Sequence, residues 1–281
     1  MPGRREFCSN GGGTLNSAER FTGRVESYRQ FRPRYPDAVA ALLETERALN
    51  QSSLIADVAA GTGLLAEIFL ARGYEVTAIE PNAEMRAVCA ALAKQYPRLR
   101  CVDGTAESTG LPSHSFDLIT VGQALHWFDL SRTRAEFVRI LRRGGWCAVV
   151  YNERRLGGDG FHDGYEKLLR EFGIDYATVQ RQHLTPERIP GFFAPSEMRR
   201  IALSNAQLLT LEGLEGRIVS SSYMPQPEPS SHRSSSAQDG ARAYVRYAAM
   251  RAAIADLFEE FQQNGRVRLE YECVVYYGQL E

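Results

Sequence analysis

Short apolar runs and helically spaced apolar residues alternate through the first 152 residues. The apolar runs are typical of strands buried on both faces of a sheet. We expect them at 54–58, 74–80, 99–103, 116–121 and 146–151. The stretches between them predict helices at 64–70, 83–95 and 131–142. Strand and helix alternating at this spacing predict an α/β fold with a parallel, doubly wound sheet.

The second half has a less regular pattern. Helical periodicity covers 161–182 and 242–262, and two extended stretches cover 198–210 and 267–278. Residues 225–240 are rich in Pro and Ser, which is typical of a surface loop.

The N-terminal region has two parts. Residues 1–17 are polar and glycine-rich, so we expect them to be disordered. Residues 18–36 combine aromatics, arginines and prolines ahead of an amphipathic helix over 37–50. The simplest interpretation of 18–36 is a connector whose aromatic side chains cover the end of the sheet.

The glycine turn after the first strand is the strongest candidate for a ligand site. Gly61 and Gly63 separate the strand at 54–58 from a helix, and Asp57 stands just before the turn. Glycine permits a sharp turn and leaves room for a ligand, while the helix N-terminus offers free backbone N–H groups. In a parallel sheet such turns lie at the edge where nucleotide-like ligands bind.

Two cofactors fit this turn. Residues 61–66 match the G-x-G-x-x-A pattern of dinucleotide-binding proteins. Asp57 would crowd a pyrophosphate, however, whereas a carboxylate suits a cationic ammonium group. Glu80 ends the second strand, where it can accept hydrogen bonds from ribose hydroxyls, although an acid there can also simply begin a helix. Together they favour S-adenosylmethionine over NAD.

These motifs resemble those of class I S-adenosylmethionine-dependent methyltransferases, in the small-molecule branch often named type 11, which includes enzymes similar to trans-aconitate methyltransferase. The matching stretches cover roughly the first half of the chain and lie at 57–63, 80–82, 104–107, 116–119 and 123–128. One departure is Ala59, where many members have a third glycine.

The resemblance implies a Rossmann-like, seven-stranded sheet, mostly parallel with an antiparallel last strand, plus helical cap insertions. It implies an arm at 18–50 that folds over the cofactor, a cofactor-binding core at 51–152, and an acceptor cap with the completing strands at 153–281. The expected cofactor-binding residues are Tyr28, Arg32, Asp57, Ala59, Gly61, Gly63, Glu80, Pro81, Thr105, Ala106, Glu107 and Gln123. For Glu107, capping a helix is a competing role.

The acceptor is expected beyond the fourth strand, where the methyl donor should point. His126 stands there beside Trp127. A histidine next to a tryptophan is usually a packed core residue, but one placed here can take a proton from a hydroxyl acceptor. The further acceptor-side candidates are Asn152, Tyr223 and Tyr277.

Composition narrows the partners. The net charge is −1 and the pI is about 6.6, so no overall basic excess points to nucleic acid or a membrane surface. The five cysteines lack C-x-x-C spacing, and no cluster of acids and histidines predicts a metal site. We expect a cytoplasmic monomer or homodimer that acts on a small molecule. An NAD-dependent oxidoreductase and a non-catalytic S-adenosylmethionine-binding protein remain as alternatives.

Overall fold

The computed structural model describes residues 25–46, 49–50, 52–158, 160–174, 176, 188–225 and 237–280. The predicted disordered segment 1–17 lies outside the described residues. So do parts of the predicted helix 161–182 and of the predicted loop 225–240.

Seven strands form one sheet in the order β3-β2-β1-β4-β5-β7-β6. Their bounds are β1 (Leu54–Val58), β2 (Glu75–Ile79), β3 (Leu99–Val102), β4 (Phe116–Gly122), β5 (Leu141–Arg154), β6 (Met198–Leu209) and β7 (Val267–Gln279). The strands β1 to β5 pair in parallel, whereas β7 is antiparallel to both β5 and β6. The predicted sheet, mostly parallel with an antiparallel last strand, is therefore confirmed.

Helices cover both faces of this sheet. One face packs on α2 (Ala38–Thr45), α3 (Ala66–Leu70) and α4 (Ala83–Ala91), which a short turn, η2 (Leu92–Lys94), extends. The other face packs on α5 (Leu130–Ile140) and α8 (Arg188–Phe193). Each face thus has its own apolar cluster, as a doubly wound sheet requires.

The fifth strand is longer than the sequence pattern predicts. It begins at Leu141, so the helix expected to reach 142 ends at Ile140. Gly144 and Gly145, expected to form a turn before the strand, lie inside it. The pairing of β4 with β5 jumps from Phe116↔Leu141 to Leu118↔Trp146, so the two glycines belong to a bulge.

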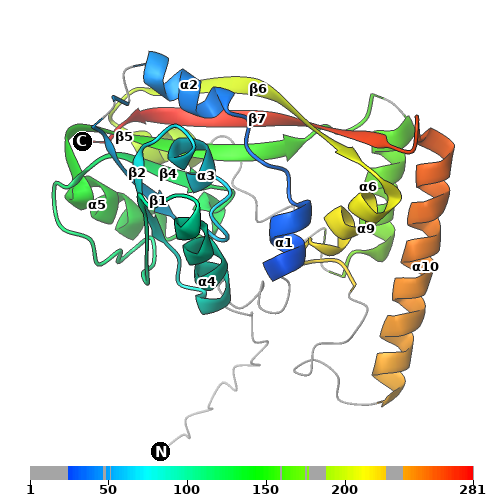
Figure 1. Cartoon of the computed structure of the whole chain (residues 1–281). Helices are drawn as coiled ribbons and strands as arrows, with labels where there is room; N and C mark the ends of the chain where they lie inside the picture. The colour runs from blue at the N-terminus through cyan, green and yellow to red at the C-terminus, as the bar shows by residue number, and fades with distance from the viewer. Residues whose placement is uncertain are drawn as a thin grey trace, which may run out of the picture.

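Three long strands carry the chain beyond the core. β5, β6 and β7 have 14, 12 and 13 residues, against five in β1. At about 3.3 Å per residue they span roughly 40 Å. Figure 1 shows β6 and β7 running from the core to a separate group of helices, formed by α6 (Gly160–Phe172), α9 (Leu211–Val219) and α10 (Ala237–Phe261). We call this group, with the strand ends that it covers, the cap.

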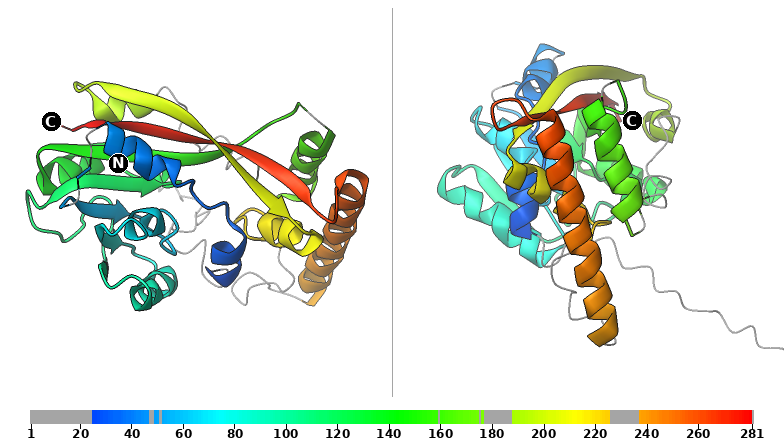
Figure 2. Two further views of the ribbon diagram at one scale, coloured as in Figure 1. Left: turned by 45° about the horizontal axis from the view of Figure 1, so that its top comes forward. Right: turned by 90° about the vertical axis from the view of Figure 1, so that its right-hand side faces the viewer.

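The cap has its own apolar core. Tyr165 of α6, Leu214 of α9 and Met250 of α10 are fully buried there with Leu269 of β7. The helices α8 and α9 were not expected from the sequence pattern. The left view of Figure 2 shows the same separation between core and cap.

The N-terminal arm fills the space between core and cap. Its first described helix, α1 (Val25–Phe31), lies between the two groups in Figure 1. It packs closely on α9, because a Cβ on Gly216 would lie 2.4 Å from the ring of Phe31. A side chain at position 216 would push the arm away from the cap.

Candidate active site

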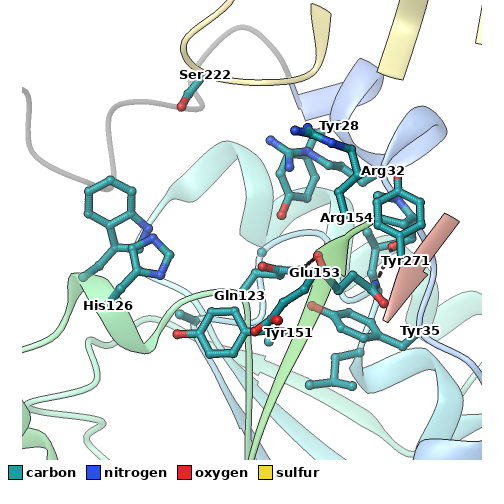
Figure 3. A pocket seen from close by; sticks show the side chains of 18 of the residues that line it. Tyr28, Arg32, Tyr35, Gln123, His126, Tyr151, Glu153, Arg154, Ser222 and Tyr271 are labelled. Atoms are coloured by element: carbon teal, nitrogen blue, oxygen red, sulfur yellow. Dashed lines mark hydrogen bonds between the residues drawn. The ribbon is translucent and has the colours of Figure 1, made fainter. Parts of the chain in front are cut away.

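A cavity of about 430 Å³ opens at the carboxyl ends of β1, β4 and β5, between the core and the cap (Figure 3). Its wall combines the glycine turn, the ends of β4 and β5, the arm and the cap. Of the residues predicted from the sequence, those that line it are Tyr28, Arg32, Asp57, Ala59, Gly61, Gln123, His126, Trp127, Asn152 and Tyr223.

Asp57 lies at the inner wall of the cavity with no exposed surface. The hydroxyl of Thr120, its neighbour on β4, donates a 2.7 Å hydrogen bond to Asp57 Oδ1. The other oxygen, Oδ2, is buried and has no hydrogen-bond partner among the described residues. Burial disfavours the charged carboxylate and raises the pKa of Asp57 to about 7. A cation at Oδ2 would reverse that penalty.

The glycine turn has an unusual backbone. Ala59, Gly61 and Gly63 have φ angles of +55°, +58° and +83°, all in the left-handed region. Ala59 therefore occupies a backbone conformation that glycine adopts more easily than alanine. At Gly63 a Cβ would also lie 2.8 Å from Leu92 Cδ1 and 2.9 Å from Cys89 Sγ, so this glycine lets the turn approach the α4 region.

Glu80 supports the turn from the next strand and does not line the cavity. Its Oε2 accepts a 2.8 Å hydrogen bond from the N–H of Gly61, and its Oε1 accepts one of 2.9 Å from the N–H of Asn82. Asn82 in turn caps α4 by accepting from the N–H of Met85. Burial raises the pKa of Glu80. Contact between Glu80 and a ribose stays a prediction.

The ends of β4 and β5 form the floor of the cavity. Gln123 has a φ of +57°, and its side-chain amide donates a 3.1 Å hydrogen bond to the carbonyl of Asn152. Strained non-glycine backbone of this kind is concentrated at functional sites. The side chain of Asn152 accepts a 2.9 Å bond from Asn205 Nδ2, which also donates to the carbonyl of Arg34. Asn152 therefore belongs to a network that joins β5, β6 and the arm.

His126 and Trp127 form one side of the cavity. Both belong to the short turn η3 (Leu125–Trp127), and their ring centroids lie 4.6 Å apart. His126 also lies 6.2 Å from the ring of Tyr151. Figure 3 shows His126 on the opposite side of the cavity from Tyr28 and Arg32. A ligand group held between these two sides can contact the imidazole of His126.

The arm closes the cavity above the glycine turn. Arg29 Nη1 donates a 2.9 Å hydrogen bond to the carbonyl of Thr62, which anchors α1 to the turn. Arg32 lies over the ring of Tyr28, with 4.8 Å from Cζ to the ring centroid. Its Nη2 donates a 3.1 Å bond to the carbonyl of Ser220 in the cap. The arm therefore connects the glycine turn to the cap.

Some predicted residues lie away from the cavity wall. Thr105 pairs with Ser108 in an isolated bridge, Ala106 is buried in the core, and Glu107 accepts a 3.0 Å hydrogen bond from the N–H of Asp129. Glu107 thus holds the residue that caps α5. Gly63 and Pro81 do not line the cavity either.

Tyr277 does not line the cavity, contrary to the expectation from the sequence. Successive residues of a strand point to opposite faces. Tyr276 lines the cavity, whereas Tyr277 points to the other face and stacks on Trp146 with 6.1 Å between ring centroids. Of these two neighbouring residues of β7, one therefore lines the cavity and the other packs against Trp146 on the opposite face of the sheet.

Sequence reasoning missed the part of the wall that the cap provides. The missed residues include Arg154, Tyr176, Arg217 and Tyr271. None belongs to a recognisable motif. The paths of β5, β7 and α9 bring Arg154, Tyr271 and Arg217 to the cavity, and Tyr176 reaches it from the segment after α6. Among the described residues, no group of three or more metal-ligating side chains is found, and no helix is long and apolar enough to cross a bilayer.

Comparison with known families identifies a domain in the core. Residues 56–149 match a family described as a methyltransferase domain. An uncharacterised methyltransferase of Mycobacterium tuberculosis is 38% identical over 140 residues, which cover 49% of this chain and 54% of the relative. One from Schizosaccharomyces pombe is 32% identical over 131 residues, 46% of this chain and 51% of the relative. The chain thus spans about half the length of these curated relatives.

Solved structures agree on the fold. A methyltransferase structure from Anaeromyxobacter dehalogenans superimposes with a TM-score of 0.61 at 23% identity, and the match covers 89% of this chain and 98% of that one. The fold is therefore the Rossmann-like fold of class I methyltransferases. Together the comparisons support a class I S-adenosylmethionine-dependent methyltransferase domain in this chain. The narrower similarity to trans-aconitate methyltransferase stays a prediction.

Proposed function

We propose that this protein transfers a methyl group from S-adenosylmethionine to a small-molecule acceptor, at a hydroxyl or carboxylate oxygen. The proposal rests mainly on the state of Asp57. Its Oδ2 is buried without a hydrogen-bond partner in the described chain, and the residue lines the cavity together with the glycine turn. A carboxylate in that state fits the ammonium group of an amino acid. It does not fit the pyrophosphate of a dinucleotide.

The donor side of the cavity follows from the same residues. Asp57 would hold the amino-acid end of the donor, and the left-handed backbone at Gly61 would give it room. The carboxylate of Glu80 fixes Gly61 and so maintains the shape of the turn. The arm, anchored through Arg29, would exclude water from above. When bound, the sulfonium donor supplies an electrophilic methyl group.

The acceptor side requires orientation more than acid–base work. Holding two reactants in line in a dry cavity supplies much of the acceleration of a displacement reaction. Trp127 and Tyr223 would position the acceptor, and Gln123 and Asn152 form the polar floor. His126 can accept the proton of a hydroxyl acceptor. A carboxylate acceptor would need no base.

Calorimetric titration of the full chain with S-adenosylhomocysteine and, separately, with NAD tests the donor site. We expect binding of S-adenosylhomocysteine and none of NAD. Tight binding of NAD alone would identify a dinucleotide-dependent oxidoreductase instead. The Asp57→Ala variant should lose S-adenosylhomocysteine binding, with Asp103→Ala, which changes an exposed acid outside the cavity, as the control.

Catalysis needs its own assay, because a protein that only binds the donor would pass the titration. The full chain is incubated with S-adenosylmethionine and a panel of hydroxylated and carboxylated small molecules. Formation of S-adenosylhomocysteine is then measured against a reaction without acceptor. We expect turnover that depends on the acceptor. Donor binding without turnover across the panel would favour the non-catalytic alternative.

A further inference from the structure

Three arginines from different elements line the one cavity. Arg32 comes from the arm, Arg154 from the end of β5, and Arg217 from α9. Figure 3 shows Arg32 and Arg154 on the side opposite His126, together with Tyr28 and Tyr271. Three guanidinium groups that line one cavity need negatively charged or hydrogen-bonding groups to offset their charge. The three arginines differ in the groups that do so.

Arg154 has an acidic partner. Its Nη2 contacts Glu166 Oε2 in an ion pair whose side chains are 11% and 13% exposed. The same guanidinium lies 4.8 Å from the centroid of the Tyr165 ring. Glu166 therefore offsets the charge of Arg154 within the cap, although Arg154 Nε, like Arg32 Nε, is buried without a hydrogen-bond partner among the described residues.

Arg217 is only 6% exposed, yet its hydrogen bonds go to hydroxyl groups. Nε donates to Tyr271 Oη at 3.0 Å, and Nη1 donates to Ser221 Oγ at 3.1 Å. Tyr271 Oη in turn donates a hydrogen bond to an amide oxygen, Gln207 Oε1, at 2.8 Å. The hydrogen-bond chain from Arg217 thus ends without an acid, and Arg217 forms no ion pair with any described residue.

Arg32 lies near Arg217 at the end of α9, where the two arginines bond to the neighbouring residues Ser220 and Ser221. Its Nη2 donates to the carbonyl of Ser220, and its Nε is buried without a partner among the described residues. Burial and the nearby charge of Arg217 both lower the pKa of Arg32. Two guanidinium groups that repel each other therefore share one part of the cavity.

The protein itself compensates these two charges poorly. The carbonyl end of α9 attracts cations, but a helix terminus carries only about half a unit charge. Asp57 and Glu153 are the acids that line the cavity, and neither pairs with Arg32 or Arg217 in the described chain. Burying unpaired charge is costly, and charged groups of this kind that line a cleft are candidates for a functional site.

Resting on the proposed function, we infer that the acceptor carries an anionic oxygen group, a carboxylate or a phosphate, which Arg217 binds together with Arg32. A guanidinium matches either group with two parallel hydrogen bonds. Tyr28, Tyr223 and Tyr271 surround the same part of the cavity and would pack on the body of the acceptor. Asp57 would hold the ammonium of the donor on the core side, so the two ligands would bind to opposite charges.

The experiment uses the full chain saturated with S-adenosylhomocysteine, which fills the donor site. Phenylacetate and phenyl phosphate are titrated calorimetrically, with phenylacetamide as the neutral probe of similar shape. We expect at least one anion to bind about tenfold or more tightly than the amide, the factor typical of a charge-assisted hydrogen bond. Which anion binds better distinguishes a carboxylate site from a phosphate site.

Variants of Arg217 test whether this residue causes the preference for the anion over the amide. Arg217→Met should weaken binding of the preferred anion about tenfold and leave the affinity for S-adenosylhomocysteine within about threefold of the wild type. Arg251→Met is the matched control, because Arg251 pairs with Glu215 on the surface and lies outside the cavity. If circular dichroism shows that Arg217→Met is unfolded, Arg217→Lys, which keeps the charge but loses the fork, should lose about threefold for the anion and nothing for the amide.

Three results would contradict different parts of the proposal. Equal affinity for the anions and the amide would overturn the inference and leave the donor assignment intact. A loss of S-adenosylhomocysteine binding in Arg217→Met as large as the loss for the anion would show that Arg217 holds the donor's own carboxylate. No binding of S-adenosylhomocysteine to the wild type would contradict the proposed function itself.

Discussion

Thr120 Oγ1 donates a 2.7 Å hydrogen bond to Asp57 Oδ1 across the β1–β4 pair, while Asp57 Oδ2 is buried without a hydrogen-bond partner in the described chain. The half-satisfied carboxylate is costly for the protein alone, because a buried acceptor that lacks a donor keeps its full desolvation penalty. The same feature makes Asp57 a strong site for a cation.

Asp57→Asn should stabilise the ligand-free protein at pH 8. The folded state raises the pKa of Asp57 from 3.8 to about 7 and keeps a proton that the unfolded chain has lost, so the free energy of unfolding falls as pH rises from about 4 to about 7. Asparagine removes the charge, and we expect a gain of roughly 2–4 kcal/mol above pH 7. Urea denaturation at pH 5 and pH 8 measures it. The raised pKa of Asp57 would be contradicted if the free energy of unfolding of the wild type rose from pH 5 to pH 8 and Asp57→Asn showed the same rise.

Affinity for S-adenosylhomocysteine should depend on the same titration. The ammonium group needs the ionised carboxylate, so with a pKa of about 7 the dissociation constant should be about tenfold weaker at pH 6 than at pH 8. Calorimetry across this range measures the dependence. Asp57→Asn should bind weakly at every pH, whereas His126→Asn should keep the wild-type slope. If the pH dependence of the dissociation constant disappeared in His126→Asn, the titrating group would be His126 and not Asp57.

The two turn glycines should differ in their sensitivity to alanine. Gly61→Ala meets only the cost of the left-handed backbone, about 1–2 kcal/mol, because the nearest atom to a new Cβ is Met85 Sδ at 3.8 Å. Gly63→Ala adds collisions with Leu92 and Cys89 and should cost about 2–4 kcal/mol. Urea midpoints compare the two variants. Gly191→Ala, on a helix with open space around it, is the control and should be neutral or stabilising.

Glu80→Gln should loosen the turn. Glutamine has one acceptor oxygen, and its amide group would face an N–H donor of Gly61 or Asn82. We expect a loss of about 1–3 kcal/mol in the free energy of unfolding, and S-adenosylhomocysteine affinity at least tenfold weaker. Glu75→Gln, an exposed acid at the start of the same strand, is the matched control. Equal urea midpoints for the two variants would show that the Glu80 contacts with the turn carry little energy.

Glu166→Gln tests the neutralised arginine of the cap. It leaves Arg154 charged and nearly buried without its negative partner, with only neutral hydrogen-bond acceptors such as Tyr176 Oη beside it among the described residues. Removing one partner of a buried pair typically costs about 3–5 kcal/mol. The Glu259→Gln variant changes an exposed acid on α10 and should leave the thermal midpoint unaltered. A wild-type midpoint for Glu166→Gln would mean that Arg154 does not depend on this acid.

The sequence alone determined the sheet core and the turn at its centre. Asp57, Ala59 and Gly61 follow one another at the end of a strand, so a local pattern was enough to place them on the cavity wall. Gln123 and Asn152 were predictable for the same reason, because the carboxyl ends of parallel strands meet at one edge of the sheet.

Only the tertiary structure decided the cap side. Arg217 lies 54 residues from Tyr271 in the chain, and their contact depends on how far β7 runs beyond the core and where α9 packs against it. Tyr276 rather than Tyr277 faces the cavity because the strand register fixes the face, which the sequence pattern of β7 did not reveal. Local sequence encodes turns and strand ends, whereas the partners of a buried charge are set by packing between segments that are distant along the chain.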